Sequence, residues 1–424
     1  MRKLGLGLIA LLATVALARV SYSQIFPKVP DVISGPPASP SVLDPFGDDP
    51  PIAAVSDWQT RRAPLLRSAL AQSVYGEMPP ALPSQVLARQ PLVATRVAPG
   101  TRMQQLTIGF GDSGDRGRVN VVLVQPGGST RPRALIIIQN FCGNAVAVRN
   151  RLDDVRSLTD PPVPCRDPME TLSHIILGRY PHAPPLSLIA ERGYAVAMVY
   201  AGDLVPDDPR TAHPALARLY GHPPRLAPGG ALAAWAWLYS ALGQSLNREP
   251  GLQSVPVVAW GHSRNGKAAL LAAATDPHIA AVIAHQSGRG GAALTRSNAG
   301  ESVAQITKNF GYWFTPRFAT YAGREADIPV DQHQLLALIA PRPVLIGSGD
   351  RDAWSDPAGA FRAVQAAAPV YELYGVKPFE QTRMAEPDLA RTQAYFMRRG
   401  THGVTTEDWT LFLQFLDAQF PEPS

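Results

Sequence analysis

A serine lies between a stretch that predicts a buried strand and a stretch that predicts a helix. Ser263 follows the apolar run Val255–Trp260, and residues 261–266 are Gly-His-Ser-Arg-Asn-Gly, followed by an Ala- and Leu-rich segment. Small residues beside such a serine permit the sharp strand-to-helix turn that exposes a nucleophilic hydroxyl above a sheet. The usual spacing is Gly-x-Ser-x-Gly, so Gly266 comes one position late. The surroundings of Ser263 nevertheless favour a nucleophile over an accidental match.

A serine hydroxyl is a poor nucleophile at neutral pH, so it needs a base and a carboxylate that orients the base. His402 is the candidate base, because it lies in a loop just before the predicted last helix, Thr406–Gln419. A serine, then an acid, then a histidine along the chain is the order of an α/β-hydrolase triad.

Three aspartates offer the carboxylate, since each follows the predicted strand Val344–Gly347. We favour Asp352, which lies a few residues past the strand. Asp350 fits a cap of the turn, and Asp356 precedes a proline and a helix, where an N-cap is the simpler interpretation. Asp350 and Asp356 remain alternatives for the acid.

The elements that must position these groups alternate as in a series of β-α-β units. Continuous apolar runs suit strands buried on both faces of a parallel sheet, where reactive groups gather at the carboxyl ends of the strands. We predict an α/β-hydrolase fold, a mostly parallel central sheet with helices on both faces in a three-layer sandwich. The predicted strands are Val119–Gln125, Ala134–Gln139, Ala195–Tyr200, Val255–Trp260, Ala280–Ala284, Val344–Gly347 and Val370–Tyr374, and the predicted helices are Ala231–Leu242, Lys267–Ala274, Pro357–Ala367 and Thr406–Gln419.

The first residues have the pattern of a secretory signal peptide, with a basic start at Arg2 and Lys3 and an apolar stretch that ends in Ala16-Leu17-Ala18. The stretch is shorter than the roughly 20 residues that span a bilayer, so we expect cleavage and no stable membrane anchor. We assign residues 1–18 to the signal peptide, 19–51 to an extended Pro-rich leader and 52–424 to a single catalytic domain. We expect export, to the periplasm or the extracellular space.

The 424 residues contain 2 cysteines, Cys142 and Cys165. In an oxidising compartment we favour a disulfide between them, which would stabilise the fold by roughly 3 kcal/mol; two unpaired thiols are the alternative. No Cys/His spacing predicts a zinc site, and we expect no metal and no organic cofactor. The formal charge of +5 is mild and no basic run has interleaved aromatic residues, so nucleic acid is not an expected partner.

Residues 261–267, Gly-His-Ser-Arg-Asn-Gly-Lys, resemble the elbow of the glucuronoyl esterases, carbohydrate esterase family fifteen, in which the second glycine is also late. This family cleaves esters between the glucuronic acid of xylan and lignin alcohols. Further motifs are similar and occur in the family's order along the chain, among them Asn-Phe-Cys-Gly-Asn at 140–144, Gln-Ser-Gly-Arg-Gly-Gly at 286–291, Asp-Ala-Trp-Ser-Asp-Pro at 352–357 and Thr-His-Gly at 401–403. The resemblance therefore covers most of the predicted domain.

By this resemblance Ser263 is the nucleophile and His402 is the base. Arg264 would help to form the oxyanion hole through its backbone N–H and its guanidinium, and Lys267 and Trp354 would contact the glucuronoyl ring. A fixed cation and an N–H beside the elbow agree with acyl transfer, which develops a negative oxygen there.

One residue departs from the family pattern. Many members have Glu after the strand that follows the elbow, where this chain has Gln286. An amide can hold a histidine or line the substrate pocket, but it cannot offset the charge of an imidazolium, so that task falls to Asp352. Glu301 is a further candidate contact of the sugar, although an exposed helix position fits it equally well.

These observations predict a secreted serine esterase, similar to 4-O-methyl-glucuronoyl methylesterases, that acts on esters of plant cell-wall glucuronoxylan with lignin. We expect a monomer. An acetyl or feruloyl esterase on xylan would use the same triad, but Arg264 and Lys267 favour a uronic acyl group. The replacement at Gln286 motivates a third hypothesis, a catalytically silent carbohydrate-binding homologue.

Overall fold

The computed structural model describes residues 24–33, 41–44, 49–93, 97–128, 131–148, 155, 157–159, 183–221 and 229–422. The predicted signal peptide (1–18), part of the predicted leader (19–51) and Cys165 lie outside these residues. Export and the disulfide with Cys142 therefore stay predictions. Within the described ranges, no helix is both long enough and apolar enough to cross a membrane.

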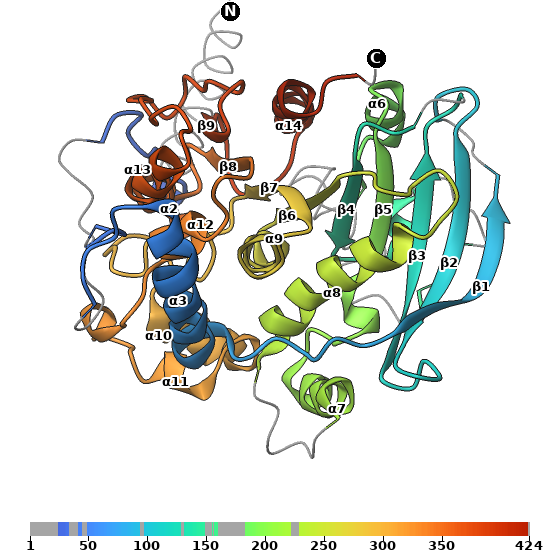
Figure 1. Ribbon diagram of the computed structural model, residues 1–424, viewed down its shortest axis with the longest axis horizontal. Helices are drawn as coiled ribbons and strands as arrows, with labels where there is room; N and C mark the ends of the chain where they lie inside the picture. Colours follow the sequence, from blue (N-terminus) through green and yellow to red (C-terminus); the bar gives the residue numbers. More distant parts are fainter. Residues whose placement is uncertain are drawn as a thin grey trace, which may run out of the picture.

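The described residues form a 9-stranded sheet with the strand order β1-β2-β3-β5-β4-β6-β7-β8-β9 (Figure 1). The pairs β1–β2, β2–β3 and β3–β5 are antiparallel, and all pairs from β5 to β9 are parallel. The mostly parallel sheet predicted from the sequence is confirmed. The strands are β1 (Ser84–Leu92), β2 (Arg102–Phe110), β3 (Gly117–Gln125), β4 (Leu135–Asn140), β5 (Ala195–Tyr200), β6 (Val257–His262), β7 (Ile279–His285), β8 (Val344–Gly349) and β9 (Gln393–Arg398).

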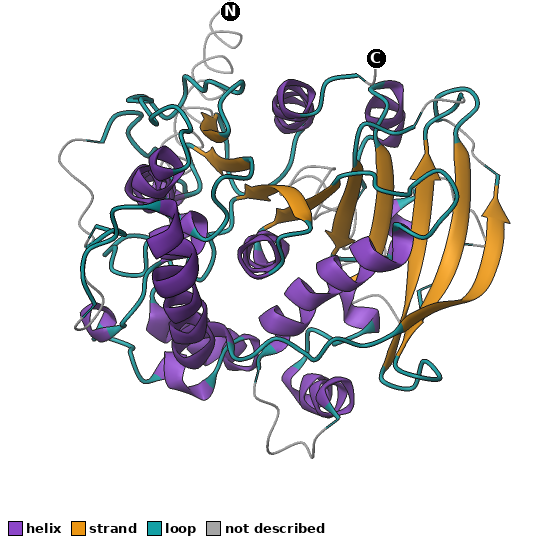
Figure 2. Ribbon diagram, in the orientation of Figure 1, coloured by secondary structure: helices purple, strands orange, loops and turns teal. Residues whose placement is uncertain are grey.

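Helices cover both faces of this sheet, as Figure 2 shows. One face packs against α3 (Ala63–Leu70), α8 (Ala231–Leu246), α9 (Arg264–Thr275), α12 (Gln332–Ala337) and α13 (Pro357–Leu373), and the other packs against α6 (Leu186–Glu191) and α14 (Thr406–Gln419). The other described helices are α2 (Val55–Asp57), α4 (Asn144–Ala147), α7 (Pro209–Tyr220), α10 (Val303–Phe310) and α11 (Pro316–Ala319), and π-helical turns flank α3 at Trp58–Arg62 and Ala71–Tyr75. Short 3-10 turns lie at Ala201–Asp203, Gly311–Trp313, Glu325–Asp327 and Ala353–Ser355.

Alternate residues of each central strand enter two separate apolar cores. On β4, Leu135 and Ile137 belong to the core beneath α8 and α9, whereas Ile136 and Ile138 belong to the core beneath α6 and α14. A strand with both faces buried needs a continuous apolar run and no alternation. This explains why the sequence pattern located the central strands.

The predicted strand Val370–Tyr374 is wrong, because these residues continue α13 or follow its end. The helix runs through Pro369, although a proline inside a helix removes a backbone hydrogen bond and usually kinks or ends the helix. Val364 and Tyr371 are both buried and two helical turns apart, so the apolar spacing of this segment is helical. The strand beside β8 is β9, which the sequence analysis missed, as it missed β1 and β2 at the opposite edge.

Residues 24–33, which belong to the predicted leader, pack on the loop after β8. The N–H of Val29 donates to the carbonyl of Asp350 at 2.7 Å, and Arg351 Nη1 donates to the carbonyl of Phe26 at 2.8 Å. This extended segment therefore supports a loop that also carries Asp352.

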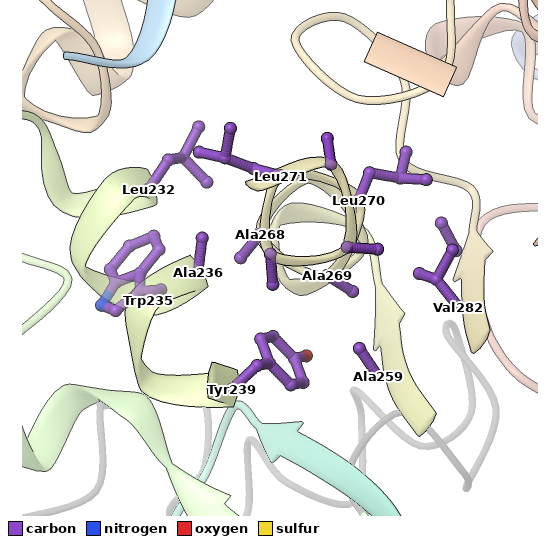
Figure 3. Packing of buried hydrophobic residues seen from close by; sticks show 14 of the residues in the cluster. Leu232, Trp235, Ala236, Tyr239, Ala259, Ala268, Ala269, Leu270, Leu271 and Val282 are labelled. Atoms are coloured by element: carbon purple, nitrogen blue, oxygen red, sulfur yellow. The ribbon is translucent and has the colours of Figure 1, made fainter. Parts of the chain in front are cut away.

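Small side chains allow α8 and α9 to lie close together over the sheet. Figure 3 shows Ala236 of α8 and Ala268 of α9 between the two helices, and both are fully buried. Tyr239 of α8 donates its hydroxyl to the carbonyl of Trp260 in β6 at 2.8 Å. The packing of α8 thus supports both the strand and the helix that flank Ser263.

We expect Ala268→Leu to destabilise the fold, because the added carbons have no free volume between α8 and α9. Overpacking of this kind typically lowers the free energy of unfolding by about 1–3 kcal/mol. Urea unfolding measures this change. Ala418→Leu is the matched control, since Ala418 is an exposed position of α14, and it should stay within about 0.5 kcal/mol of the parent protein. Equal destabilisation by both substitutions would contradict the packing described here.

Candidate active site

Ser263 occupies a strained turn between β6 and α9. Its backbone has φ 54° and ψ −125°, which residues other than glycine rarely adopt, and its N–H donates to the carbonyl of His285 at 2.9 Å. A Cβ on Gly261 would lie 2.1 Å from the carbonyl oxygen of Asn265, so only glycine fits there. A Cβ on Gly266 would come within 3.0 Å of the Gly261 oxygen. The late glycine therefore serves the close packing of strand and helix.

Asp352 is the carboxylate that reaches His402. These residues lie in the loops that follow β8 and β9, and Asp352 Oδ2 is 2.8 Å from His402 Nδ1. Asp350 instead accepts the backbone N–H of Gly400 at 2.8 Å, and Asp356 caps the first turn of α13. These contacts agree with the sequence-based preference for Asp352 over the other two aspartates.

The Asp352 carboxylate stays ionised although it is buried. Burial by itself raises its pKa, but the charge of His402 and hydrogen bonds from His402 and Ser355 outweigh burial and hold the pKa below its ordinary value. An ionised carboxylate accepts hydrogen bonds only, so it draws the imidazole proton to Nδ1. His402 Nε2 is then the nitrogen that can take up a proton, as a general base requires.

Gln286 holds the histidine loop on both sides of His402. Its Nε2 donates to the carbonyl of Thr401 at 3.1 Å, and its Oε1 accepts the N–H of Gly403 at 2.7 Å. An amide has the donor and the acceptor that these two contacts need, whereas a carboxylate has acceptors only. The residue that departs from the family pattern therefore has a defined role in this structure.

Buried charges anchor the same loop from β9 and α14. Arg398 Nε lies 3.0 and 2.9 Å from the two carboxylate oxygens of Asp408, and Arg398 Nη2 donates to two carbonyls of the loop that carries His402. His285 Nε2 lies 3.2 Å from Asp408 Oδ1. Burial favours a higher pKa for Asp408, but His285 and Arg398 outweigh it and lower the pKa to about 2.

A pocket of about 290 Å³ lies at the turn of Ser263. It brings together the residues that the sequence analysis singled out, Ser263, Arg264, Lys267, Gln286, Glu301, Trp354 and His402. Phe310, Trp313 and Ser355 also line it, and Trp354 is 53% exposed at its rim. Among the residues that the structure describes, no group of three or more His, Cys, Asp or Glu is placed to hold a metal ion.

Lys267 and Glu301 are two buried ionisable groups that line this pocket and influence each other's pKa. Lys267 Nζ donates to the carbonyls of Ser287 and Arg289, both at 2.6 Å, and burial lowers the pKa of Lys267 to about 8. Burial raises the pKa of Glu301, and the nearby Lys267 opposes that rise. Because an ammonium has three donors, the two carbonyls leave one for a ligand.

Arg264 begins α9, and its guanidinium is held beside the pocket by Asp207, whose Oδ2 lies 3.0 Å from Arg264 Nη1.

The sequence analysis missed Asp207, Phe310 and Ser355 as residues of the site. The one available signal for Asp207 was its place shortly after a predicted strand, because its neighbours form an Asp- and Pro-rich stretch with no motif. Phe310 lies on a helix whose pattern does not point to a pocket.

Comparisons with known proteins agree on one group of enzymes. A family model described as glucuronyl esterase of fungi matches residues 199–375. A carbohydrate esterase of an unknown prokaryotic organism is 30% identical over 380 residues, which cover 87% of this chain and 87% of that protein. The 4-O-methyl-glucuronoyl methylesterase 1 of Wolfiporia cocos is 30% identical over 203 residues, 46% of this chain and 50% of that protein.

Two solved structures are similar over nearly their whole length. A promiscuous CE15 esterase from a marine bacterial metagenome has a TM-score of 0.76 and 28% identity, and the match covers 91% of this chain and 98% of that one. A glucuronoyl esterase from Solibacter usitatus has a TM-score of 0.74 and 28% identity, with 92% and 99% covered.

We expect Gln286→Glu to lower ester hydrolysis and not to raise it. The carboxylate lacks the N–H that binds the Thr401 carbonyl and would repel that oxygen, so His402 would be held less firmly. The predicted loss is roughly tenfold in kcat/KM, since small misplacements of a catalytic group are costly. Gln286→Met, which removes both bonds without a charge, is the comparison. A gain of activity in Gln286→Glu would show that this position acts as the acid.

We expect Asp408→Asn to destabilise the protein in a pH-dependent way. A carboxylate whose pKa is about 2 when folded and about 4 when unfolded stabilises the fold above pH 4, and this stabilisation disappears as the pH falls through 2. Breaking the buried pair with Arg398 should cost about 3–5 kcal/mol of unfolding free energy at pH 7. Urea unfolding from pH 7 to pH 2 measures the free energy of unfolding of the parent and the variant. If the difference between the two proteins does not shrink below pH 4, the stabilising role of the ionised Asp408 is contradicted.

Proposed function

The chain belongs to the glucuronoyl esterases of carbohydrate esterase family fifteen, and on that premise we propose that it hydrolyses glucuronoyl esters through Ser263, His402 and Asp352. The observation that carries this proposal is the 2.8 Å contact of Asp352 with His402 beside a pocket that Ser263 also lines. The activity as a carboxylic ester hydrolase follows from the family; the residues and the substrate are our proposal.

In the proposed first step, His402 Nε2 takes the proton of the Ser263 hydroxyl while the Ser263 oxygen bonds to the ester carbonyl carbon. The carbonyl oxygen becomes negative and is stabilised by the backbone N–H of Arg264 at the start of α9. The carbon–oxygen bond of the ester then breaks, and the imidazolium gives its proton to the leaving alcohol. The glucuronoyl group remains on Ser263 as an ester.

In the second step, a water molecule gives a proton to His402 Nε2 and bonds to the acyl carbon. The bond to Ser263 breaks, and the serine oxygen takes the proton back, which releases glucuronic acid and the original enzyme. The imidazolium forms in both steps, and the ionised Asp352 offsets its charge. Gln286 contributes position and no charge, because it binds the backbone on both sides of His402.

The pocket supports a uronic acyl group as the substrate. Lys267 and Glu301 offer a donor and an acceptor for sugar hydroxyls inside the pocket, and the exposed ring of Trp354 offers an apolar face for the sugar ring. The names of the methylesterase relatives give a 4-O-methyl-glucuronoyl ester, and by the family resemblance the partner polymers would be glucuronoxylan and its esters with lignin alcohols. Such substrates lie outside the cell, which agrees with the proposed signal peptide, residues 1–18.

A wider range of esters is the second candidate. A neighbour with 28% identity is described as promiscuous, and this chain departs from the usual family acid at Gln286. An acetyl or feruloyl ester would need the triad but not the sugar contacts of Lys267 and Glu301. Competition between substrates therefore separates the two candidates.

We expect fast release of benzyl alcohol from benzyl glucuronate and slow release of acetate from an acetylated xylan oligomer. Ser263→Ala should abolish the reaction, since it removes the nucleophile. Asp352→Asn should lower kcat by roughly 10³- to 10⁴-fold, because the neutral amide neither fixes the tautomer nor offsets the imidazolium. Steady-state assays of both variants with circular dichroism of the folded state provide the measurement.

Loss of activity only in Ser263→Ala would contradict the role of Asp352. Faster acetate release than benzyl alcohol release would contradict the substrate. An inactive parent protein on both esters would contradict the esterase proposal as a whole and favour a carbohydrate-binding homologue.

A further inference from the structure

Asp207 connects the guanidinium of Arg264 with the aromatic side of the pocket, and we propose that it is a positioning residue for ester hydrolysis that acts through Arg264. Asp207 lies in the loop between the Ala201–Asp203 turn and α7, far from the triad in the sequence. This inference rests on the proposed function, in which the start of α9 stabilises the oxyanion.

The Arg264 side chain is held on three sides. Asp207 Oδ2 lies 3.0 Å from its Nη1, and its Cζ lies 4.6 Å from the ring centroid of Phe141 and 5.8 Å from that of Trp235. Both aromatic contacts are within the range of a cation–π interaction. One carboxylate and two ring faces therefore fix a side chain that would otherwise have many rotamers.

The same carboxylate also fixes the aromatic side of the pocket. Asp207 Oδ1 accepts the hydroxyl of Tyr312 at 2.6 Å and the indole N–H of Trp313 at 2.7 Å. Trp313 lines the pocket and stacks on Phe310, with ring centroids 4.1 Å apart. The two oxygens of Asp207 thus bind different sides of the pocket. Oδ2 binds Arg264 at the elbow, and Oδ1 binds the aromatic pair Tyr312 and Trp313.

This arrangement predicts an effect on the chemical step. A negative oxygen develops beside the elbow only in the transition state, and a cation that is already in place stabilises it without reorganisation. Arg264 lies next to Ser263 in sequence and lines the same pocket. If Asp207 no longer holds it, the guanidinium must be ordered during the reaction, which lowers kcat more than it raises KM.

The experiment is a double-mutant cycle with Asp207→Asn and Arg264→Met, assayed on benzyl glucuronate and on a simple acetate ester. Asparagine keeps an oxygen that can accept from Tyr312 and Trp313, so the fold should be retained, and thermal unfolding checks this. We expect Asp207→Asn to lower kcat about tenfold on both esters, with KM within about twofold. In the Arg264→Met background, Asp207→Asn should change kcat by less than about twofold.

Asp208→Asn is the matched control, because Asp208 is the adjacent acid, pairs with the exposed Arg210 and caps α7, where asparagine serves equally well. It should leave kcat unchanged. Equal kinetics for Asp207→Asn and Asp208→Asn would overturn the proposal. So would an undiminished loss in the Arg264→Met background, or a rise in KM confined to the glucuronate ester, which would place the role of Asp207 at Trp313. Full activity of Ser263→Ala would instead remove the proposed function itself.

Discussion

The site exists only if the loops after β8 and β9 are held within hydrogen-bonding distance of each other. The contact of Asp352 with His402 at 2.8 Å joins them directly, and the bond from the Gly400 N–H to Asp350 joins them a second time. Gln286 adds two bonds from the loop after β7. Loops are the mobile parts of most folds, so this number of anchors is what makes a precise base possible on them.

Charge and position are supplied by different residues in this site. Asp352 carries the negative charge that an imidazolium needs, and Gln286 binds the backbone around His402 without a charge. Arg398 and Asp408 stabilise the same loop from the buried side, where their charges compensate each other. Replacement of the usual glutamate by Gln286 is therefore consistent with an active enzyme, because Asp352 in the loop after β8 is placed to supply the negative charge.

The central strands and the turn at Ser263 could be predicted because their signals are local, namely continuous apolar runs and small residues beside the serine. The segment after Pro369 was assigned wrongly, since the sequence of a helix with an internal proline resembles that of a helix that ends. β1 was missed because most of its residues are exposed and give no apolar run. The contacts of Asp207 and Gln286 were beyond prediction, because each depends on segments that meet only in the folded chain.

The central claim is that Asp352 and His402 activate Ser263. The most direct test is the rate at which a fluorophosphonate labels the protein, followed by intact-mass spectrometry and peptide mapping in the parent and in Asp352→Asn. The account predicts a single adduct on Ser263 that forms rapidly in the parent and far more slowly in the variant. No adduct, an adduct on another residue, or equal rates in the two proteins would contradict it.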